Sequence, residues 1–250
     1  IDLTIIVNTG DDETIHGVRL SPDIDSVIYA LARIEGPFGW GQKNDTFSVN
    51  EEYKKYISQE FNLGDKDLAL NLFRNQLFSQ GKSLTQITNI ITDKFDLNCK
   101  ILPMSDNLVS TKIKTSDGKL LDFQEYFVEL KSEPKISDVI YLESEKADIT
   151  KEVSNALDEA DKIVVGPSNP ILSIGPILAI HNLKEKLISN NSTYVVSPFI
   201  ENKAIKGPSK KNFEDLGYKS DITGIKEFYD NIGNYYIVQS GDTDKAENTI

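Results

Sequence analysis

The apolar residues of the chain alternate between strand-like runs and helix-like stripes. Leu3–Val7 is a short, continuous aliphatic run that stops at the polar turn Asn8–Asp12, the pattern of a buried strand followed by a loop. Residues 25–33 carry apolar side chains at the spacing of one helix face, and Ser21-Pro22-Asp23 is a typical helix start. The beginning of the chain therefore predicts a strand, an acidic loop and a helix.

The middle of the chain changes from helical to strand-forming patterns. Residues from about 50 to 97 predict several helices, because apolar side chains form two stripes there: Leu68, Leu72, Phe73 and Leu77, then Leu84, Ile87, Ile90 and Ile91. Residues 100–142 are rich in strand-forming runs, and the turn Ser116-Asp117-Gly118 separates Thr111–Thr115 from Phe123–Val128. A helical insertion followed by a β-hairpin is expected.

The last third predicts alternating helices and strands. Helices are expected near 151–159 and 177–189, and strands at Lys162–Val165 and Thr193–Val196. A strand-helix-strand order favours a parallel sheet with right-handed crossovers. We therefore expect a single α/β domain over residues 1–250, with a parallel sheet, a helical insertion at about 50–97 and a β-hairpin.

The net charge and the number of cysteines exclude some classes of partner and site. The 250 residues include 39 acidic and 27 basic residues, and this net charge of −12 repels nucleic-acid phosphates, with no basic run to offset it. The single cysteine, Cys99, excludes an intrachain disulfide and a cysteine-rich metal site, and it fits a reducing compartment. We expect a cytoplasmic protein with no nucleic-acid partner.

The longest uncharged stretch, from Ile163 up to Lys184, is long enough to raise the question of a membrane span. Prolines and glycines interrupt it, so a buried segment rich in loops is expected instead, with no membrane partner. The chain begins at Ile1 without the basic and apolar regions of a signal peptide, and the lack of a starting Met suggests upstream residues.

Ligands of open α/β sheets bind beyond the carboxyl ends of strands, so the loops that follow strands are the first candidates for a site. The first loop and the helix start behind it place four aspartates within fifteen residues: Asp11, Asp12, Asp23 and Asp25. Carboxylates at strand ends can hold Mg²⁺, which takes a few protein oxygens together with water and substrate phosphates. The alternative is that Asp12 and Asp23 only cap a turn and a helix.

Two later loops are candidates for binding phosphate. Residues 166–176 join a strand to a helix, and their amides and hydroxyls at the positive end of that helix suit an anion. They lack the glycine spacing of nicotinamide-binding and Walker loops, and a proline-stiffened connection is the alternative. The loop after Val196 brings Lys206 and Lys210, which either neutralise phosphate or solvate the surface.

The remaining candidates are weaker. Trp40, between two glycines, is either a platform for a flat ring or a half-buried core residue. Asp65 and Asp67 either join the same site or start a helix. His16 and His181 are poor general bases, and no nucleophile-base-acid arrangement is visible. The residues alone indicate an α/β protein that binds a phosphorylated ligand, with Mg²⁺ as the expected cofactor.

Eight segments of the chain match one protein family both in their residues and in their order along the sequence. They are Asn8–Asp12, Ser21–Asp25, Asn44–Phe47, Leu63–Ala69, Leu102–Asp106, Phe123–Val128, Gly166–Pro170 and Ser173–Leu178. In these segments the chain resembles the 2-phospho-L-lactate transferases, and the resemblance covers nearly its whole length. Any one segment is a weak indication, whereas eight in order are specific.

The resemblance implies a Rossmann-like core with an inserted helical region, usually as a homodimer, and a magnesium-dependent reaction of coenzyme F(420) biosynthesis. In it, the ribityl hydroxyl of 7,8-didemethyl-8-hydroxy-5-deazariboflavin attacks the phosphorus of a guanosine diphosphate adduct, and GMP departs. The transferred group derives from lactate, enolpyruvate or a glycerate. Such a transfer needs charge neutralisation and in-line positioning more than a covalent nucleophile, which agrees with the missing triad.

The family pattern also implies roles for residues by position. Asp12 and Asp25 are expected to be catalytic, and Asp11, Asp12 and Asp25 to hold Mg²⁺. Asp25, Asn62 and Trp40 are expected to bind the deazaflavin, although many relatives have a basic residue in place of Asn62. Asp25→Asn is expected to keep the fold and to lower turnover about 10²-fold. The guanosine diphosphate portion is expected at Gly166, Ser168, Asn169, Ser173, Gly175 and Lys206.

One difference from the family and two alternatives accompany the resemblance. Relatives place a strand and a glycine-rich turn before the segment that matches Ile1 and continue beyond Ile250, so we expect both ends to be missing here and their restoration to raise activity and stability. A non-catalytic, nucleotide-sugar-binding regulator of related fold would carry different residues around the acidic loop. A nicotinamide-dependent dehydrogenase would carry a glycine fingerprint that these residues lack.

Overall fold

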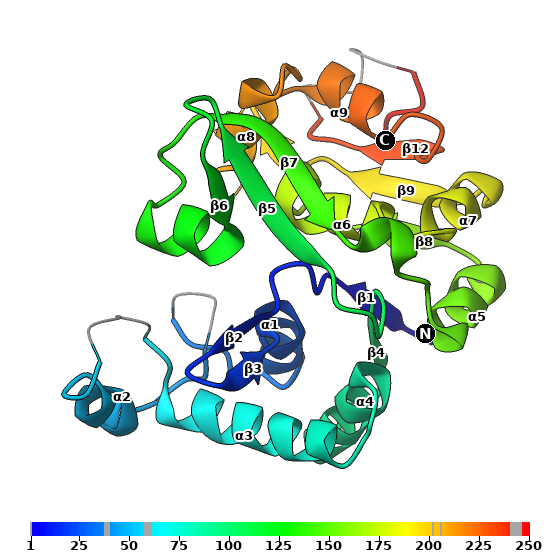
Figure 1. The fold of residues 1–250 in the computed structure, drawn as a ribbon. Helices are drawn as coiled ribbons and strands as arrows, with labels where there is room; N and C mark the ends of the chain where they lie inside the picture. Colours follow the sequence, from blue (N-terminus) through cyan, green and yellow to red (C-terminus); the bar gives the residue numbers. More distant parts are fainter. Residues whose placement is uncertain (1, 38–40, 58–61, 202, 206, 241–246) are drawn as a thin grey trace. The chain divides into compact units, whose positions relative to one another are not determined.

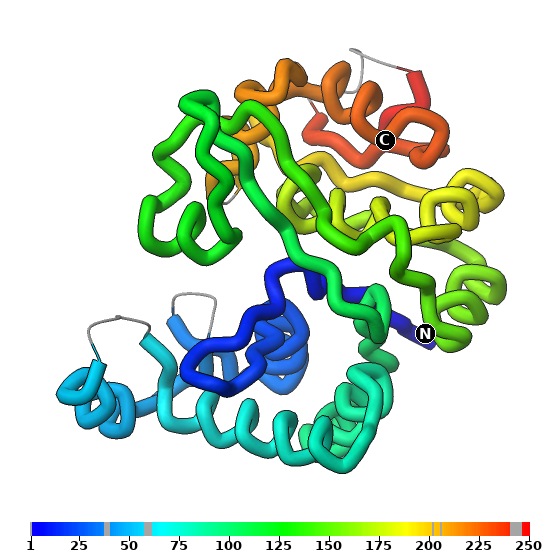
Figure 2. The backbone as a smooth tube through the Cα atoms, in the orientation of Figure 1, coloured from blue at the N-terminus to red at the C-terminus, as the bar shows by residue number. Residues whose placement is uncertain are grey.

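The computed structural model describes residues 2–37, 41–57, 62–201, 203–205, 207–240 and 247–250. This part of the chain divides into two compact units, Ile1–Asp106 and Asn107–Ile250, whose backbones can be followed in Figure 1 and Figure 2. The expectation of a single domain stays a prediction.

The first unit begins with the predicted strand, loop and helix. Strand β1 (Thr4–Val7) pairs in parallel with β4 (Lys100–Pro103). Between β1 and the first helix lies an antiparallel hairpin that the sequence did not predict, formed by β2 (Glu13–Ile15) and β3 (Val18–Leu20). The helices are α1 (Pro22–Leu31), α2 (Ser48–Tyr53), α3 (Asp65–Ser79) and α4 (Leu84–Lys94).

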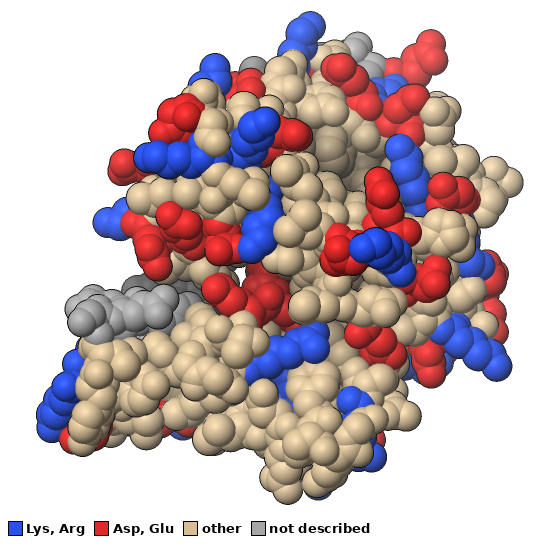
Figure 3. Space-filling model, in the orientation of Figure 1, with Lys and Arg blue, Asp and Glu red and all other residues tan. Residues whose placement is uncertain are grey.

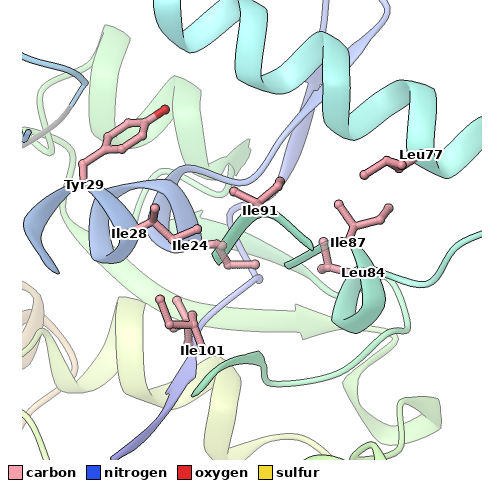
Figure 4. Packing of buried hydrophobic residues seen from close by; sticks show 9 residues of the cluster. Ile24, Ile28, Tyr29, Leu77, Leu84, Ile87, Ile91 and Ile101 are labelled. Carbon is pink, nitrogen blue, oxygen red and sulfur yellow. The ribbon is translucent and has the colours of Figure 1, made fainter. Parts of the chain in front are cut away.

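The core of this unit gathers apolar side chains from both parallel strands and from α1, α3 and α4 (Figure 4). Helix α4 begins with a capping box in which Ser83 and Gln86 each accept a hydrogen bond from the other's backbone N–H. The buried residues of the core are Val7, Ile24, Ile28, Tyr29, Leu77, Leu84, Ile87, Ile91 and Ile101.

The predicted apolar stripe is confirmed in α4 and is partly wrong in α3. Leu77 is buried, but Leu72 is 52% exposed, while Asn71 and Arg74 lie inside. The buried face of α3 is therefore partly polar. The physical reason is that Arg74 meets a carboxylate of the acidic loop, as described below.

The second unit contains a parallel sheet with the strand order β12-β9-β8 and an antiparallel sheet with the order β6-β5-β7. The parallel strands are β8 (Ile163–Val165), β9 (Thr193–Val196) and β12 (Tyr235–Ile237). The antiparallel strands are β5 (Ser110–Thr115), β6 (Leu120–Asp122) and β7 (Ile136–Leu142), and a further short pair consists of β10 (Phe199–Ile200) and β11 (Lys203–Ala204).

Helical segments connect these strands. The α-helices are α5 (Lys151–Glu159), α6 (Gly175–Leu178), α7 (Leu183–Ser189), α8 (Ser209–Asp215) and α9 (Ile222–Phe228). Two π-helical turns, η1 (Glu125–Glu129) and η3 (Pro170–Ile174), and one 3₁₀ turn, η2 (Ser144–Lys146), complete the described elements.

Two details of the prediction for this unit were wrong. Strand β5 forms a hairpin as expected, but its partner is β6, and most of Phe123–Val128 lies in the turn η1, where Tyr126 is fully buried. The helix expected over 177–189 is interrupted after α6, because Asn182 adopts a left-handed backbone with φ of 63° before α7 begins. The α/β class with a parallel sheet and inserted helices is confirmed.

Helix length and surface charge are relevant to the predictions about membrane and nucleic-acid partners. In the part of the chain that the structure describes, no helix is both long and apolar enough to cross a membrane. On the face drawn in Figure 3, Lys and Arg side chains are scattered among Asp and Glu side chains and do not gather into one area. The exclusion of nucleic acid as a partner stays a prediction.

Candidate functional site

Four aspartates of the first unit come together where β1 ends and α1 begins, and we call them the acidic cluster: Asp11, Asp12, Asp23 and Asp25. The first two follow β1 in the polar turn, and the other two lie in the first turn of α1. Asp11, Asp12 and Asp25 are each no more than 7% exposed. The sequence predicted these carboxylates in one region, and the structure brings them together, with Asp23 partly exposed.

Asn8 links two members of the cluster. Its Nδ2 donates to Asp11 Oδ1 at 3.2 Å and to Asp23 Oδ2 at 3.0 Å, while its Oδ1 accepts from the Gly10 amide at 2.8 Å. Burial, followed by the charges of Asp23 and Asp12, raises the pKa of Asp11 well above its ordinary value. Burial also raises the pKa of Asp23. One neutral amide thus serves two carboxylates whose negative charges it cannot balance.

The two carboxylate oxygens of Asp12 differ in their hydrogen bonds. Its Oδ2 accepts from Ser21 Oγ at 2.8 Å and from Arg19 Nη2 at 3.3 Å. Within the described part of the chain, its buried Oδ1 has no hydrogen-bond partner. Burial raises the pKa of Asp12 to about 7, although Arg19 and Ser21 oppose the shift. Asp12 is therefore able to take up or release a proton near neutral pH.

Asp25 differs from the others because it has a full counter-charge. Both of its oxygens accept from the guanidinium of Arg74, one through Nη2 and the other through Nη1 at 3.1 Å. Arg74 is fully buried on α3 and also donates to Asn71 Oδ1. Burial opposes the charge on Arg74, but the neighbouring carboxylates of Asp25 and Asp12 raise its pKa, so the guanidinium keeps its charge. Burial raises the pKa of Asp25, and the charge and hydrogen bonds of Arg74 oppose this shift.

The cluster suits a cation that keeps most of its water ligands better than one whose ligands all come from the protein. Among the described residues, no group of three or more Asp, Glu, His or Cys side chains is arranged to hold a metal ion. Mg²⁺, however, usually keeps several waters and takes only one or two protein carboxylates. Asp11 and Asp23, which Asn8 holds together, fit that requirement, whereas both oxygens of Asp25 already face Arg74.

Asn62 and Asp65, which were also expected at this site, make other contacts. Asn62 is exposed, and its Oδ1 accepts from Asn50 Nδ2 at 3.0 Å and from Lys54 Nζ at 3.2 Å. Asp65 accepts from the amides of Ser48 and Val49 and so caps the start of α2. Trp40 lies outside the described residues, and its expected role stays a prediction.

The loop after β8 carries the expected phosphate-binding residues of the second unit. Gly166 and Ser168 are exposed, while Asn169 and Ser173 are partly buried. Asn169 Oδ1 accepts from the amides of Ile171 and Leu172 at 3.0 and 3.2 Å and thereby caps the turn η3. The exposed part of this loop is free to meet a ligand, and Asn169 is tied to the fold.

Gly175 has a packing reason for lacking a side chain. It is buried, and a Cβ placed on it would lie 2.0 Å from the hydroxyl of Tyr141. That hydroxyl donates to the Ile171 carbonyl at 2.6 Å. The structure therefore gives Gly175 a role in close packing, and its expected contact with phosphate stays a prediction. Lys206 lies outside the described residues.

Sequence reasoning missed Arg74, Asn71 and Asn8 as members of the site. Arg74 was detectable in part, because it precedes the buried Leu77 by three residues and so falls on the inward face of α3. A lone arginine on an apolar helix face indicates a buried acidic partner. The partner's identity was not available from that pattern.

The 2-phospho-L-lactate transferase family, described as 2-phospho-L-lactate transferase CofD, matches residues 1–249. The chain belongs to this family. The 2-phospho-L-lactate transferase of Methanocaldococcus jannaschii is 36% identical to it over 98% of this chain and 80% of the relative. The corresponding protein of Methanococcus vannielii is 37% identical with the same coverage.

A solved structure agrees with the fold of this family member. The crystal structure of a UPF0052 family protein, BH3568 from Bacillus halodurans, superposes with a TM-score of 0.62 at 17% identity, covering 98% of this chain and 76% of the other. At that identity the likeness concerns the fold alone. The predicted family and the transferase class are therefore confirmed by the family match and the relatives.

The ion pair changes what we expect of Asp25→Asn. The neutral amide would leave the guanidinium of Arg74 buried without a counter-charge, so the variant should lose about 3–5 kcal/mol of unfolding free energy and not keep the wild-type stability. Adding Arg74→Met should recover part of that loss, because both charges are then removed. Urea unfolding of the single and double variants measures the effect, with the exposed Asp93→Asn as the control. Wild-type stability of Asp25→Asn would contradict the burial of a working ion pair.

Asp12 predicts a specific dependence of stability on pH. The folded state holds the Asp12 proton up to about pH 7, whereas the unfolded chain releases it near the ordinary value of 3.8. The unfolding free energy should therefore fall as pH rises through this window, and Asp12→Asn should lack that part of the slope. Between about pH 5 and about pH 8, the variant should gain more than about 1 kcal/mol relative to the wild type. A pH-independent difference in urea unfolding would show that Asp12 titrates normally.

Proposed function

We propose that the chain moves a phospholactyl or phosphoenolpyruvyl group from a guanosine diphosphate adduct to the ribityl hydroxyl of 7,8-didemethyl-8-hydroxy-5-deazariboflavin, releasing GMP, in coenzyme F(420) biosynthesis. The family match and the relatives support a 2-phospho-L-lactate transferase. The observation that carries the finer proposal is that Asp11, Asp12 and Asp23 lie together where burial raises the pKa of each, so that a bound cation would favour their ionised forms.

In this proposal the acidic cluster binds the metal ion and the attacking alcohol. We assign Mg²⁺ to Asp11 and Asp23, because Asn8 holds their oxygens together and leaves their charge uncompensated. When bound, the ion would neutralise charge on the transferring phosphate oxygens. Asp25 is assigned no direct contact with the metal, because both of its oxygens already face Arg74.

Asp12 is assigned the role of general base. A hydroxyl that attacks phosphorus must give up its proton, and a base works best when its pKa lies near the operating pH. Burial brings the pKa of Asp12 to about 7, and its Oδ1 is not engaged by any described residue. The oxygen opposite to it is fixed by Ser21 and Arg19, so the free oxygen has a defined orientation.

The loop after β8 is assigned the guanosine diphosphate portion. Gly166 and Ser168 expose backbone and hydroxyl groups ahead of the capped turn η3, an arrangement that suits phosphate oxygens. Ser173 and Lys206 remain sequence-based proposals for the same ligand. Homodimerisation and a cytoplasmic location also remain predictions.

Product analysis tests this function directly. The protein is incubated with the deazaflavin, Mg²⁺ and the guanosine diphosphate adduct of lactate, enolpyruvate or glycerate in turn, and mass spectrometry follows the products. We expect GMP and a new deazaflavin phosphodiester with one of the three donors. Asp12→Asn should lower turnover about 10²-fold or more, as expected for loss of a general base.

Asp93→Asn is the matched control, because Asp93 is an exposed aspartate at the end of α4 in the same unit. It should leave turnover unchanged. Absence of a phosphodiester with all three donors would reject the transferase proposal. Binding of a nucleotide sugar without any transfer would favour the regulator instead.

A further inference from the structure

Four polar groups of the second unit form a continuous chain of hydrogen bonds, which we call the amide relay. Asn169 Nδ2 donates to Asn212 Oδ1 at 2.9 Å, and Asn212 Nδ2 donates to the hydroxyl of Tyr126 at 2.8 Å. The Tyr126 hydroxyl in turn donates to the carbonyl of Ser132 at 3.3 Å. The relay thus joins the loop after β8 to helix α8 and to the turn η1.

All donors in the relay point in one direction. Burial raises the pKa of Tyr126, against the opposing charge of Lys211, so its hydroxyl keeps the hydrogen that it donates to Ser132. The hydroxyl oxygen is then an acceptor for the Asn212 amide nitrogen. Asn212 must therefore turn its carbonyl oxygen toward Asn169, which fixes which end of the Asn169 amide faces α8.

The orientation of Asn169 decides the cap of η3. With its nitrogen facing Asn212, its oxygen faces the amides of Ile171 and Leu172 and accepts from both. A reversed amide would present its nitrogen to those two donors and leave them unsatisfied. The relay consequently holds the point at which the exposed residues 166–168 enter the turn.

Because the relay is buried, removing one of its members destabilises the protein by leaving the remaining polar groups without partners. Asn212 and Tyr126 are both fully buried, so a missing partner leaves a polar group without water or protein to bond. Asparagine is also a poor helix former, and Asn212 lies inside α8, beside the fully buried Phe213. Local helix formation therefore does not explain Asn212, whereas the hydrogen bonds at both ends of its side chain do.

We propose that Asn212 is a positioning residue for the guanosine diphosphate donor: it fixes Asn169 and through it the loop 166–168 that receives the diphosphate. The inference rests on the proposed function, because it takes this loop as the donor site. It also changes the role of Asn169, from a contact of the ligand to a support of the loop that makes the contact.

Binding of guanosine 5′-diphosphate, measured by calorimetry, separates positioning from general stability. Asn212→Leu keeps the side-chain size and removes both hydrogen bonds, so its Kd should rise about tenfold. Phe213→Leu is the matched control, because it trims a fully buried neighbour on α8 and leaves the relay intact. It should lower the melting temperature with the Kd unchanged. Tyr126→Phe should raise the Kd less than Asn212→Leu, since the bond between Asn212 and Asn169 remains.

Amide hydrogen exchange at Ile171 and Leu172 gives a readout without ligand. It should be faster in Asn212→Leu and unchanged in Phe213→Leu. A lowered melting temperature of Asn212→Leu with wild-type Kd and exchange would make Asn212 merely structural and overturn the inference. If Asn212→Leu does not fold, wild-type exchange at both amides in Tyr126→Phe overturns it. If the wild type transfers the acid but does not bind guanosine 5′-diphosphate, the assignment of this loop to the donor is rejected. If the wild type shows no transfer, the proposed function is rejected.

Discussion

The buried pairing of Asp25 with Arg74 is the interaction on which the first unit depends. It brings a charged residue of α3 against the first turn of α1, and both oxygens of Asp25 accept from the guanidinium. Arg19 supports a second carboxylate, Asp12, from a partly exposed position. Asp11 and Asp23 both accept from the side chain of Asn8, a neutral amide that brings no counter-charge. The fold therefore gathers carboxyl groups whose charged forms its own described side chains do not fully stabilise, and a cation bound there would stabilise those forms.

The same imbalance gives the aspartates different chemical properties. Asp25 has a partner that does not lose its proton, and this partner opposes the rise in pKa that burial causes, so Asp25 suits a structural ion pair. Asp12 has a pKa of about 7 because burial outweighs its partners, so it suits proton transfer. Residue type alone does not separate these roles, since both residues are aspartates of the same acidic loop and helix start.

Local patterns in the sequence predicted the parts of the site that neighbouring residues determine. The run Leu3–Val7, the acidic turn and the helix start behind it gave the correct order of β1, loop and α1. Arg74 could not be assigned to Asp25 in this way, because 49 residues separate the two and only tertiary packing joins them. The relay from Asn169 to Asn212 spans 43 residues and was missed for the same reason. Phe123–Val128 was read as a strand, but the burial of Tyr126 and its bond to Ser132 favour a tight turn.

Thermal unfolding in the presence of Mg²⁺ tests the central claim most directly, because a ligand that binds only the folded state raises its stability. The wild type and Asp11→Asn are compared at about pH 8 in MgCl₂ and in NaCl of equal ionic strength, which separates specific binding from screening. We predict that MgCl₂ raises the melting temperature of the wild type above its value in NaCl, and that Asp11→Asn loses this difference. Equal melting temperatures of the wild type in the two salts, or an undiminished difference in Asp11→Asn, would contradict a cation site built on the uncompensated carboxylates.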